Sequence, residues 1–399
     1  MSGVDSAASD WGSSGLAYLS GLPDGAPDFS RSAVLARARR VADEFRRRTA
    51  VGVDAATILA GRAALLGVRR RGRISAGGAT RLLAGRDGWL AITLSRPDDV
   101  DAVPALLESA AADDDPWPAL HEWAASRRAA EAAERARLLG IPAATLGETP
   151  PAPPRVRPLG RTAPARALPG LLVADLSSMW AGPLCGQLLA QAGAVVVKVE
   201  SPARPDGTRA GPAAFFDWMN GGKLSYAGDF DNPAALRTLL GVADVVIEGS
   251  RPAALARRGL GPDDVAPRDG RVWLRITGHG TDAQHACWVA FGDDAAVSGG
   301  LVGTGGGPVF CADAIADPLT GLHAGLAVAE SLGRGGGELI EMSMAAVAAT
   351  YAALPLAAAQ SGYPAPPPQL PPPSMPAAQL GADNAVVERL VAERRFAAC

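Results

Sequence analysis

Residues 171–200 read LLVADLSSMWAGPLCGQLLAQAGAVVVKVE, and this stretch decides the fold. The apolar runs at 171–176 and 194–199 have the length and composition of buried strands. Residues 184–191 between them have the pattern of a helix, which Gly193 ends. A strand, a helix and a second strand form a βαβ unit, which predicts an α/β fold with a Rossmann-like parallel sheet. Because such sheets carry ligands at the carboxyl ends of their strands, the loop at 180–182 is the first candidate site.

The rest of the chain divides around this unit. Residues 1–30 are rich in Ser, Gly, Ala and Asp, which predicts a flexible N-terminus. Helical and short extended patterns alternate in residues 31–147, which predicts a smaller α+β domain placed N-terminally. Its expected helices cover 32–48, 55–66, 103–111, 117–125 and 129–139, and its expected strands cover 89–94 and 141–146. A Pro-rich linker (148–168), the α/β domain (169–360) and a Pro-rich segment with a final helix (361–399) follow.

Composition limits the classes of function. The 399 residues are 48% hydrophobic, which is enough for two domain cores, and the net charge of −3 gives no reason to expect nucleic acid or a membrane as partner. Residues 2–30 lack a basic segment followed by an apolar run, and no stretch approaches the roughly 20 apolar residues of a spanning helix, so a cytoplasmic protein is expected. The four cysteines (185, 287, 311 and 399) are scattered, which favours free thiols over disulfides or a zinc site, and no metal is predicted.

Common nucleotide and hydrolase motifs are missing from the sequence. The turn after the first strand reads WAGPLCG rather than GxGxxG, and Pro183 removes an amide that a pyrophosphate would need, which disfavours NAD. Walker, GxSxG and HExxH motifs do not occur. Lys198 and Lys223 are the only lysines in an Arg-rich chain, and both fall in or near the βαβ unit. Arginine would replace them poorly if they have a specific role there, although two lysines can also remain by chance.

Several motifs in residues 170–343 occur together in one known family. They are DLSSMWAGPLCGQLLAQAGAVVVKVE, the turn at 220–223, ADVVIEGSRPAALARRGLG, RITGHG and ADPLTGLHAGLAVAE, in this order. In these motifs the chain resembles the family III CoA-transferases, the group of formyl-CoA transferase, carnitine CoA-transferase and α-methylacyl-CoA racemase. The usual member begins with the βαβ unit and has its small domain later. The resemblance therefore implies a member with rearranged domain order.

The resemblance implies a nucleophile and a reaction. Family transferases carry an aspartate at the start of an apolar helix with a glycine four positions later, and Asp317 and Gly321 match this pattern. A carboxylate can attack a thioester without a general base, and CoA can then recapture the aspartyl anhydride as an aspartyl-CoA thioester. Amides of glycine segments such as 303–307 are candidate oxyanion donors. The motif match favours Asp317 as the nucleophile over Asp293, Asp294 and Asp313. Without the resemblance, Asp317 reads as a helix cap, with Pro318 at the first helical position, and Asp293 and Asp294 read as turn or cap residues.

The resemblance also implies that CoA is a substrate, with no tightly bound cofactor. Arginine or lysine suits its phosphates and an apolar slot suits its adenine. By motif match the expected CoA contacts are Trp180, Ala181, Met219, Asn220, Gly221, Gly222, Lys223, Gly249, Ser250, Arg251, Arg257, Thr277, Gly278 and His279. Family members commonly have Asn-Phe-Arg-Pro where this chain has Gly249-Ser250-Arg251-Pro252, and Asn-Arg-Gly-Lys at 220–223 where this chain has Asn-Gly-Gly-Lys.

Transfer of CoA between an acyl-CoA and a small carboxylic acid is therefore expected, and the resemblance implies a homodimer. Two alternatives stay open. An α-methylacyl-CoA racemase needs an acid and a base on opposite faces of its substrate, and such enzymes have Gly-His-Asp where this chain has Phe291-Gly292-Asp293, although His279 and His285 are near in sequence. A CoA-binding relative without catalysis is the other alternative. The sequence does not specify the acyl group or the acceptor.

Overall fold

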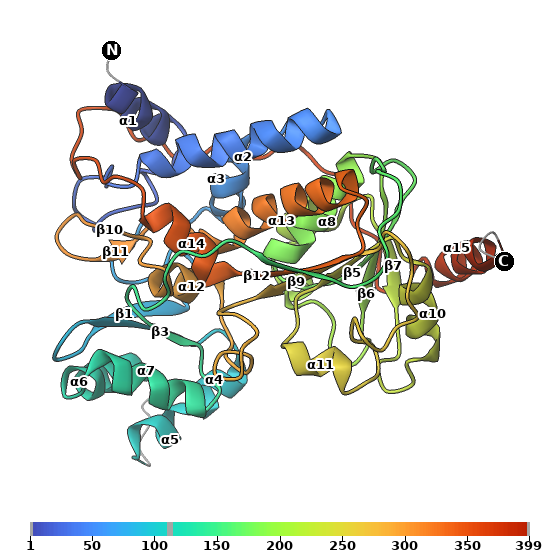
Figure 1. Cartoon of the computed structure of the whole chain (residues 1–399). Helices are drawn as coiled ribbons and strands as arrows, with labels where there is room; N and C mark the ends of the chain where they lie inside the picture. The colour runs from blue at the N-terminus through green and yellow to red at the C-terminus, as the bar shows by residue number, and fades with distance from the viewer. Residues whose placement is uncertain (1–2, 110–114, 397–399) are drawn as a thin grey trace.

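The structure is a computed structural model that describes residues 3–109 and 115–396. Its centre is a seven-stranded sheet of order β4-β12-β9-β8-β5-β6-β7 (Figure 1). All neighbouring strands are parallel except the edge strand β4, which is antiparallel to β12. The strands are β4 (Arg155–Pro158), β5 (Leu172–Leu176), β6 (Val195–Glu200), β7 (Leu224–Ala227), β8 (Val245–Glu248), β9 (Val272–Thr277) and β12 (Glu338–Ser343). The predicted α/β fold with a parallel sheet is confirmed.

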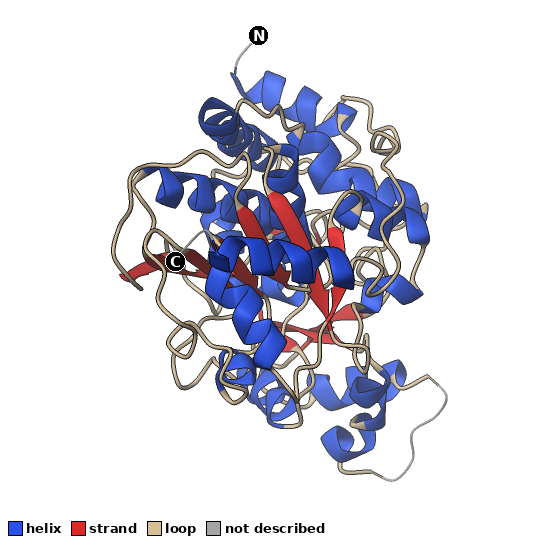
Figure 2. Cartoon of the chain, turned by 90° about the vertical axis from the view of Figure 1, so that its right-hand side faces the viewer, coloured by secondary structure: helices blue, strands red, loops and turns tan. Residues whose placement is uncertain are grey.

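Helices cover both faces of this sheet, as Figure 2 shows. Along β5, Val173 faces one apolar core, and Leu172 and Ala174 face a second one, as the alternation of side chains in a strand requires. The first core lies under α2, α3, α8, α13 and α14, and the second lies under α10 and α15. The helices of this domain are α8 (Ala181–Gln191), α9 (Ala213–Asn220), α10 (Ala234–Val242), α11 (Pro252–Ala256), α12 (Gly292–Ser298), α13 (Ala316–Gly333), α14 (Met344–Ala352) and α15 (Asn384–Phe396), with a 3-10 turn at Gly207–Ala210.

The first three helices belong to the sheet domain, which corrects two expectations. Residues 3–30 are not an unstructured arm: α1 (Gly3–Ser13) is helical, and Trp11 and Phe29 are buried in the first core. α2 (Ala33–Thr49) and α3 (Ala55–Leu66) were assigned to the small domain, but their apolar faces join the same core. Residues 3–30 are rich in Ser, Gly and Asp, but they also contain enough large apolar side chains to order the segment.

The small domain is therefore shorter than residues 31–147. An antiparallel sheet of order β1-β2-β3 packs against four helices around a separate core (Figure 1). Its elements are β1 (Thr80–Ala84), β2 (Trp89–Thr93), α4 (Pro97–Asp101), α5 (Val103–Leu107), α6 (Trp117–Ala125), α7 (Ala129–Leu138) and β3 (Ala143–Thr145). The expected helix at 103–111 ends at Leu107, and positions 110 and 111 lie outside the described residues. A small hairpin of β10 (Val302–Gly303) and β11 (Val309–Phe310) lies beside this domain.

The two Pro-rich segments are held against the sheet domain. The first contains β4, and the second leads to α15 along the edge strand β7. Asp383 Oδ2 accepts a hydrogen bond from the amide of Ser225 at 2.8 Å, and Asn384 Oδ1 accepts one from Ala227 at 2.9 Å. The tail therefore satisfies the free amides that an edge strand exposes.

Free cysteines in the described chain are Cys185 and Cys311, both buried, and Cys287, which is exposed; Cys399 lies outside the described residues. Within residues 3–109 and 115–396, no helix is both long and apolar enough to cross a membrane.

Candidate active site

A cleft opens where the central strands of the sheet end. It has about 740 Å³ of empty space, part of it open to solvent. The loops after β5, β8 and β9 form most of it, as the parallel topology predicts. Among the described residues that line it, Arg251 and Asp317 are the only charged ones, and most others are small or apolar. The residues that line it include Ser177, Met179, Ala181, Gly182, Gly249, Ser250, Arg251, Ile276, Thr277, Gly278, Trp288, Phe291, Asp317 and Met344.

The loop after β5 is closely packed, and its conformation explains the glycines of WAGPLCG. A Cβ atom on Gly182 would lie 2.2 Å from the Ser177 side chain. A Cβ atom on Gly186, one turn later in α8, would lie 2.7 Å from Asp175 Oδ2. Both positions therefore require glycine. Met179 in the same loop has a left-handed backbone (φ 73°) and lines the cleft, which places an uncommon conformation at the candidate site.

Asp317 lies in the first turn of α13 and reaches the cleft. α13 approaches α8 closely at Gly321, where a Cβ atom would lie 2.7 Å from the carbonyl oxygen of Ala181. This contact gives a physical reason for the glycine four positions after the aspartate. The backbone amides of Ala181 and Gly292 lie near the Asp317 carboxylate and favour its ionised form. Burial raises the pKa of Asp317 to about 7, against the lowering effect of Arg62 and these two amides.

Three further aspartates surround this carboxylate. Asp313 is fully buried, and both of its oxygens accept hydrogen bonds from Arg62 Nη1, at 2.7 and 2.8 Å. Asp293 accepts a hydrogen bond from the amide of Ala314 at 3.0 Å, and burial together with the charge of Asp313 raises its pKa to about 7. Asp294 accepts from the Thr93 hydroxyl at 2.9 Å, and burial raises its pKa to about 7. Acid groups thus outnumber the nearby cation, Arg62.

The loop before α13 directs this cluster. Ala312 and Ala314 both have left-handed backbones, with φ of 58° and 42°, on either side of Asp313. Side chains other than glycine rarely adopt this region, and such outliers cluster at functional sites. The conformation turns Asp313 inward to Arg62 while the amide of Ala314 donates to Asp293.

The structure brings six of the expected CoA contacts to the cleft: Ala181, Gly249, Ser250, Arg251, Thr277 and Gly278. It does not bring the other eight there. Trp180 is buried with its ring against Phe215, at 5.5 Å between centroids. Arg257 is exposed beyond the end of α11 and outside the cleft lining. His279 is buried behind the cleft, with its ring 5.2 Å from that of Trp288.

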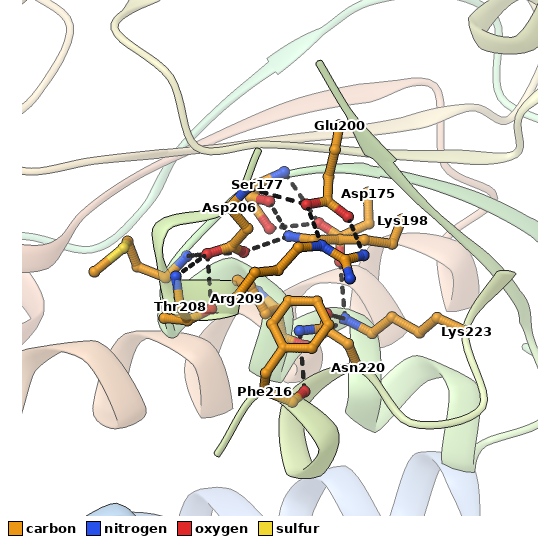
Figure 3. Close-up of polar contacts among 12 residues, drawn as sticks. Asp175, Ser177, Lys198, Glu200, Asp206, Thr208, Arg209, Phe216, Asn220 and Lys223 are labelled. Atoms are coloured by element: carbon orange, nitrogen blue, oxygen red, sulfur yellow. Dashed lines mark hydrogen bonds and ion pairs between the residues drawn. The ribbon is translucent and has the colours of Figure 1, made fainter. Parts of the chain in front are cut away.

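The turn at residues 219–223 lies away from the cleft lining. Met219, Asn220 and Lys223 are buried, and Met375 of the tail covers Gly221 and Gly222. Lys223 Nζ lies 2.9 Å from Asp175 Oδ2 and donates to the Pro183 carbonyl at 2.8 Å and to Asn220 at 3.1 Å (Figure 3). All three ammonium protons have acceptors, so this lysine is committed to the protein interior.

The second lysine is equally enclosed. Lys198 Nζ pairs with Asp206 at 2.7 Å and also donates to the Ser177 carbonyl, and Arg209 pairs with Glu200 at 2.6 Å beside it (Figure 3). The two lysines thus support the loop after β5 from beneath. Their roles are specific, as the sequence suggests, but they are structural in this arrangement.

The glycine segment 303–307 does not face Asp317, so the oxyanion donors expected there are wrong. The amides of Thr304 and Gly305 donate to Asp28 Oδ2, at 3.0 and 2.6 Å, and hold the turn between β10 and β11. The amides near Asp317 are instead those of Ala181 and Gly292. A Cβ atom on Gly292 would lie 2.3 Å from Asp317 Oδ2, so this position admits no side chain.

Sequence reasoning missed Arg62 and the apolar wall of Trp288, Phe291 and Met344. Trp288 lies under Arg137, whose guanidinium carbon is 3.7 Å from the ring centroid. A tryptophan in a polar loop after a predicted strand was an available signal for the wall. For Arg62 no local signal existed, because its partners lie more than 100 residues away in a chain rich in arginine. Within the described ranges, no group of three His, Cys, Asp or Glu is placed to hold a metal ion.

Comparison with known proteins places this cleft in a family context. The sequence model of CoA-transferase family III matches residues 168–379. Succinate–glutarate CoA-transferase of Agrobacterium fabrum is 33% identical over 202 residues, which are 44% of this chain and 50% of that protein. The probable fatty acyl-CoA transferase Rv3272 of Mycobacterium tuberculosis is 37% identical over 134 residues, which are 31% of this chain and 34% of that protein. A crystal structure of Rv3272 aligns with 47% of this chain and 57% of its own, at 29% identity and a TM-score of 0.43.

The chain spans half or less of the length of these curated relatives. The family match nevertheless covers more than half of this chain, and it includes the βαβ unit, the loops of the cleft and Asp317. The resemblance found in the motifs is therefore confirmed, and the chain belongs to CoA-transferase family III.

Proposed function

We propose that this protein transfers CoA between an acyl-CoA thioester and a carboxylic acid, with Asp317 as the nucleophile. The observation that carries the proposal is the Asp317 carboxyl group on the wall of the cleft, with the amides of Ala181 and Gly292 nearby and with a pKa raised to about 7. A raised pKa makes the carboxylate more nucleophilic while a substantial fraction stays ionised at neutral pH. The relatives named as CoA-transferases support the same chemistry.

The proposed steps balance without a further reactant. An ionised Asp317 oxygen attacks the thioester carbonyl, the C–S bond breaks, and CoA thiolate leaves behind an acyl-aspartyl anhydride. The thiolate then attacks the aspartyl carbonyl, releasing the donor acid and forming an aspartyl-CoA thioester. The acceptor carboxylate attacks this thioester to form a new anhydride, and the thiolate attacks its acyl carbonyl to give the new acyl-CoA and free Asp317.

Arg251 is the candidate partner for a CoA phosphate. It is exposed at the start of α11 and is the cationic residue among the described lining residues. The apolar wall of Trp288, Phe291 and Met344, together with Ile276, suits the pantetheine arm, which has no charged group. Of the motif-matched contacts, we retain Ala181, Gly249, Ser250, Arg251, Thr277 and Gly278 as CoA-binding residues.

We favour transfer over racemisation because of Gly292. Racemisation needs a base across the substrate from the acid, but no histidine lines the cleft among the described residues. Gly292 occupies the position of the racemase histidine, and no side chain fits there against Asp317. His279 does not replace it, because it is buried behind Trp288 and burial lowers its pKa to about 3.

Chemical trapping tests the proposal directly. The protein is incubated with an acyl-CoA and then with hydroxylamine, and the peptide that contains Asp317 is analysed by mass spectrometry. We expect a hydroxamate on Asp317. We also expect that Asp317→Ala lowers the transfer rate by a factor on the order of 10³ or more. Asp263→Asn, on the exposed surface far from the cleft lining, is the matched control and should retain the parent rate.

Each other outcome identifies an alternative. Uptake of α-deuterium from deuterium oxide without an acceptor acid would indicate a racemase. An Asp317→Ala variant that differs from the parent only in stability would indicate a CoA-binding relative without catalysis. The homodimer implied by the resemblance is also part of this proposal, and light scattering of the purified chain tests it by giving the molar mass in solution.

A further inference from the structure

Arg62 comes from a part of the chain that lies outside the family match. It belongs to α3, more than 100 residues before the matched segment begins. α3 packs closely on α9, because a Cβ atom on the preceding Gly61 would lie 2.8 Å from the Trp218 ring. This close approach brings the Arg62 side chain from the N-terminal region toward the start of α13.

The guanidinium group is fixed on several sides. Arg62 Nη1 lies 2.7 and 2.8 Å from the two oxygens of Asp313, whose side chain is fully buried. The guanidinium carbon is 5.4 Å from the ring centroid of Trp180 and 5.5 Å from that of Phe215, within the range of cation–π contacts. Such a group has little freedom to move when the charge nearby changes.

The charges around Asp317 come from three helices and one loop. They are Arg62 on α3, Asp313 in the loop before α13, Asp293 and Asp294 on α12, and Arg251, which lines the same cleft at the start of α11. Arg62 is the cation that acts most on Asp317, and Asp313 acts in the opposite sense. Asp313 likewise raises the pKa of Asp293, and Arg62 lowers it.

We propose that Arg62 is a positioning residue that sets the ionisation of Asp317, so that the N-terminal helices complete the active site. Arg62 holds one positive charge that acts on three carboxyl groups, those of Asp293, Asp313 and Asp317, and its ion pair with Asp313 fixes the position of that charge. The inference rests on the proposed function in one respect, since an ionised Asp317 is needed only if this residue attacks the substrate. Its physical content, a charge coupling between α3 and α13, is independent of the activity.

Two variants, one that removes a positive charge and one that removes a negative charge, test the coupling. Arg62→Gln removes the cation and should raise the pKa of Asp317 by about one unit or more, because a nearby opposite charge lowers a carboxyl pKa by about 1–3 units. Asp313→Asn removes an anion and should lower that pKa. Arg62→Lys keeps the charge and should leave the pKa close to that of the parent. Each pKa is measured by ¹³C NMR titration of protein labelled at the aspartate carboxyl carbon, with Asp317→Asn identifying the signal.

A control variant separates the effect from general damage. Arg70 donates to the carbonyls of Leu22, Tyr18 and Gly25, so Arg70→Gln also disrupts the N-terminal region but removes no charge beside Asp317. It should leave the Asp317 titration unchanged. If Arg62→Gln does not fold, the Asp313→Asn and Arg62→Lys titrations still decide the matter. The inference is overturned if Asp313→Asn leaves the pKa unchanged or raises it, or if Arg70→Gln shifts it as much as Arg62→Gln.

A second readout connects the coupling to catalysis. The acid limb of kcat/KM for CoA transfer should follow the Asp317 titration and move upward in pH in Arg62→Gln and downward in Asp313→Asn. A purely structural role for Arg62 would lower the rate at every pH without moving this limb, and that result would overturn the inference. If the NMR shifts occur but the parent shows no transfer at any pH, the proposed function fails while the coupling stands.

Discussion

The buried charges beneath the loop after β5 are matched one to one, whereas those at the start of α13 are not. In the first group three acids, Asp175, Glu200 and Asp206, pair with Lys223, Arg209 and Lys198 at 2.6–2.9 Å. In the second group Asp293, Asp313 and Asp317 share Arg62, and Asp294 lies beside them without a cation of the described chain acting on it. Burial opposes ionisation in both groups. The cations outweigh it for Asp175, whose pKa is lowered, but not for Asp317, whose pKa is raised to about 7.

The two groups of charges therefore differ in role: the first stabilises the fold, and the second contains the proposed nucleophile. The matched pairs hold the loop after β5 in place, and their cations lower the pKa of Asp175 and of Asp206 in spite of burial. The unmatched acids change ionisation near pH 7, where a small change in the surroundings alters their charge. The lysine positions that stand out in the sequence therefore belong to the scaffold, and the proposed nucleophile, Asp317, lies where compensation is incomplete.

Breaking a matched pair should have the largest effect on stability. Lys223→Met leaves Asp175 buried without its partner, and we expect the free energy of unfolding to fall by about 3–5 kcal/mol in urea denaturation. The double variant Lys223→Met with Asp175→Leu should recover part of this loss, because no uncompensated charge stays behind. A loss below about 1 kcal/mol in the single variant would show that the pair does not hold this part of the fold.

Asp294→Asn should show a smaller effect that depends on pH. The folded pKa of Asp294 is about 7 and its ordinary value is 3.8, so the parent loses stability as pH rises between these values. The asparagine has no such charge. We expect the stability difference between the variant and the parent to move in favour of the variant by about 2–3 kcal/mol from pH 5 to pH 8, measured by urea denaturation at each pH.

Asp175→Asn is the comparison variant for this experiment. The pKa of Asp175 is lowered, so its contribution to stability is present above the ordinary value of 3.8 and is lost only at more acid pH. Asp175→Asn should therefore be destabilised by a nearly constant amount between pH 5 and pH 8. Identical pH dependence in the two variants would remove the distinction between the matched and unmatched groups.

The sequence was sufficient to predict the sheet and to single out Asp317, which lies on the wall of the cleft, but not to predict the surroundings of either. The βαβ unit and Asp317 with Gly321 lie within continuous motifs, where a local pattern carries the information. Lys223 was expected at the CoA site, but the direction of a side chain beside a strand depends on which face the helices cover. Its ammonium group lies under α8 beside Asp175. The missing side chain of Gly186 leaves the space that this group occupies.

The position of Arg62 could not be predicted for a related reason. It depends on α3 packing against α9, and that contact joins segments about 150 residues apart through a glycine and a tryptophan. The prediction of a flexible N-terminus is wrong for residues 3–30, because average composition does not indicate the positions of a few large apolar side chains. Trp11, Leu16 and Leu19 are all buried and order this segment.

The smallest effect on stability is expected at the solvent-exposed ion pair of Arg334 and Glu338, which is about as short as the buried pair of Lys223 and Asp175. Arg334 Nη2 lies 2.8 Å from Glu338 Oε2, which is close to the 2.9 Å between Lys223 and Asp175. The Arg334 side chain is 52% exposed, whereas that of Lys223 is 1% exposed. Water already solvates the guanidinium of Arg334, so Arg334→Ala should change the free energy of unfolding by less than about 0.5 kcal/mol in the same urea experiment. A loss approaching that of Lys223→Met would mean that pair geometry, rather than burial, determines what these charges contribute.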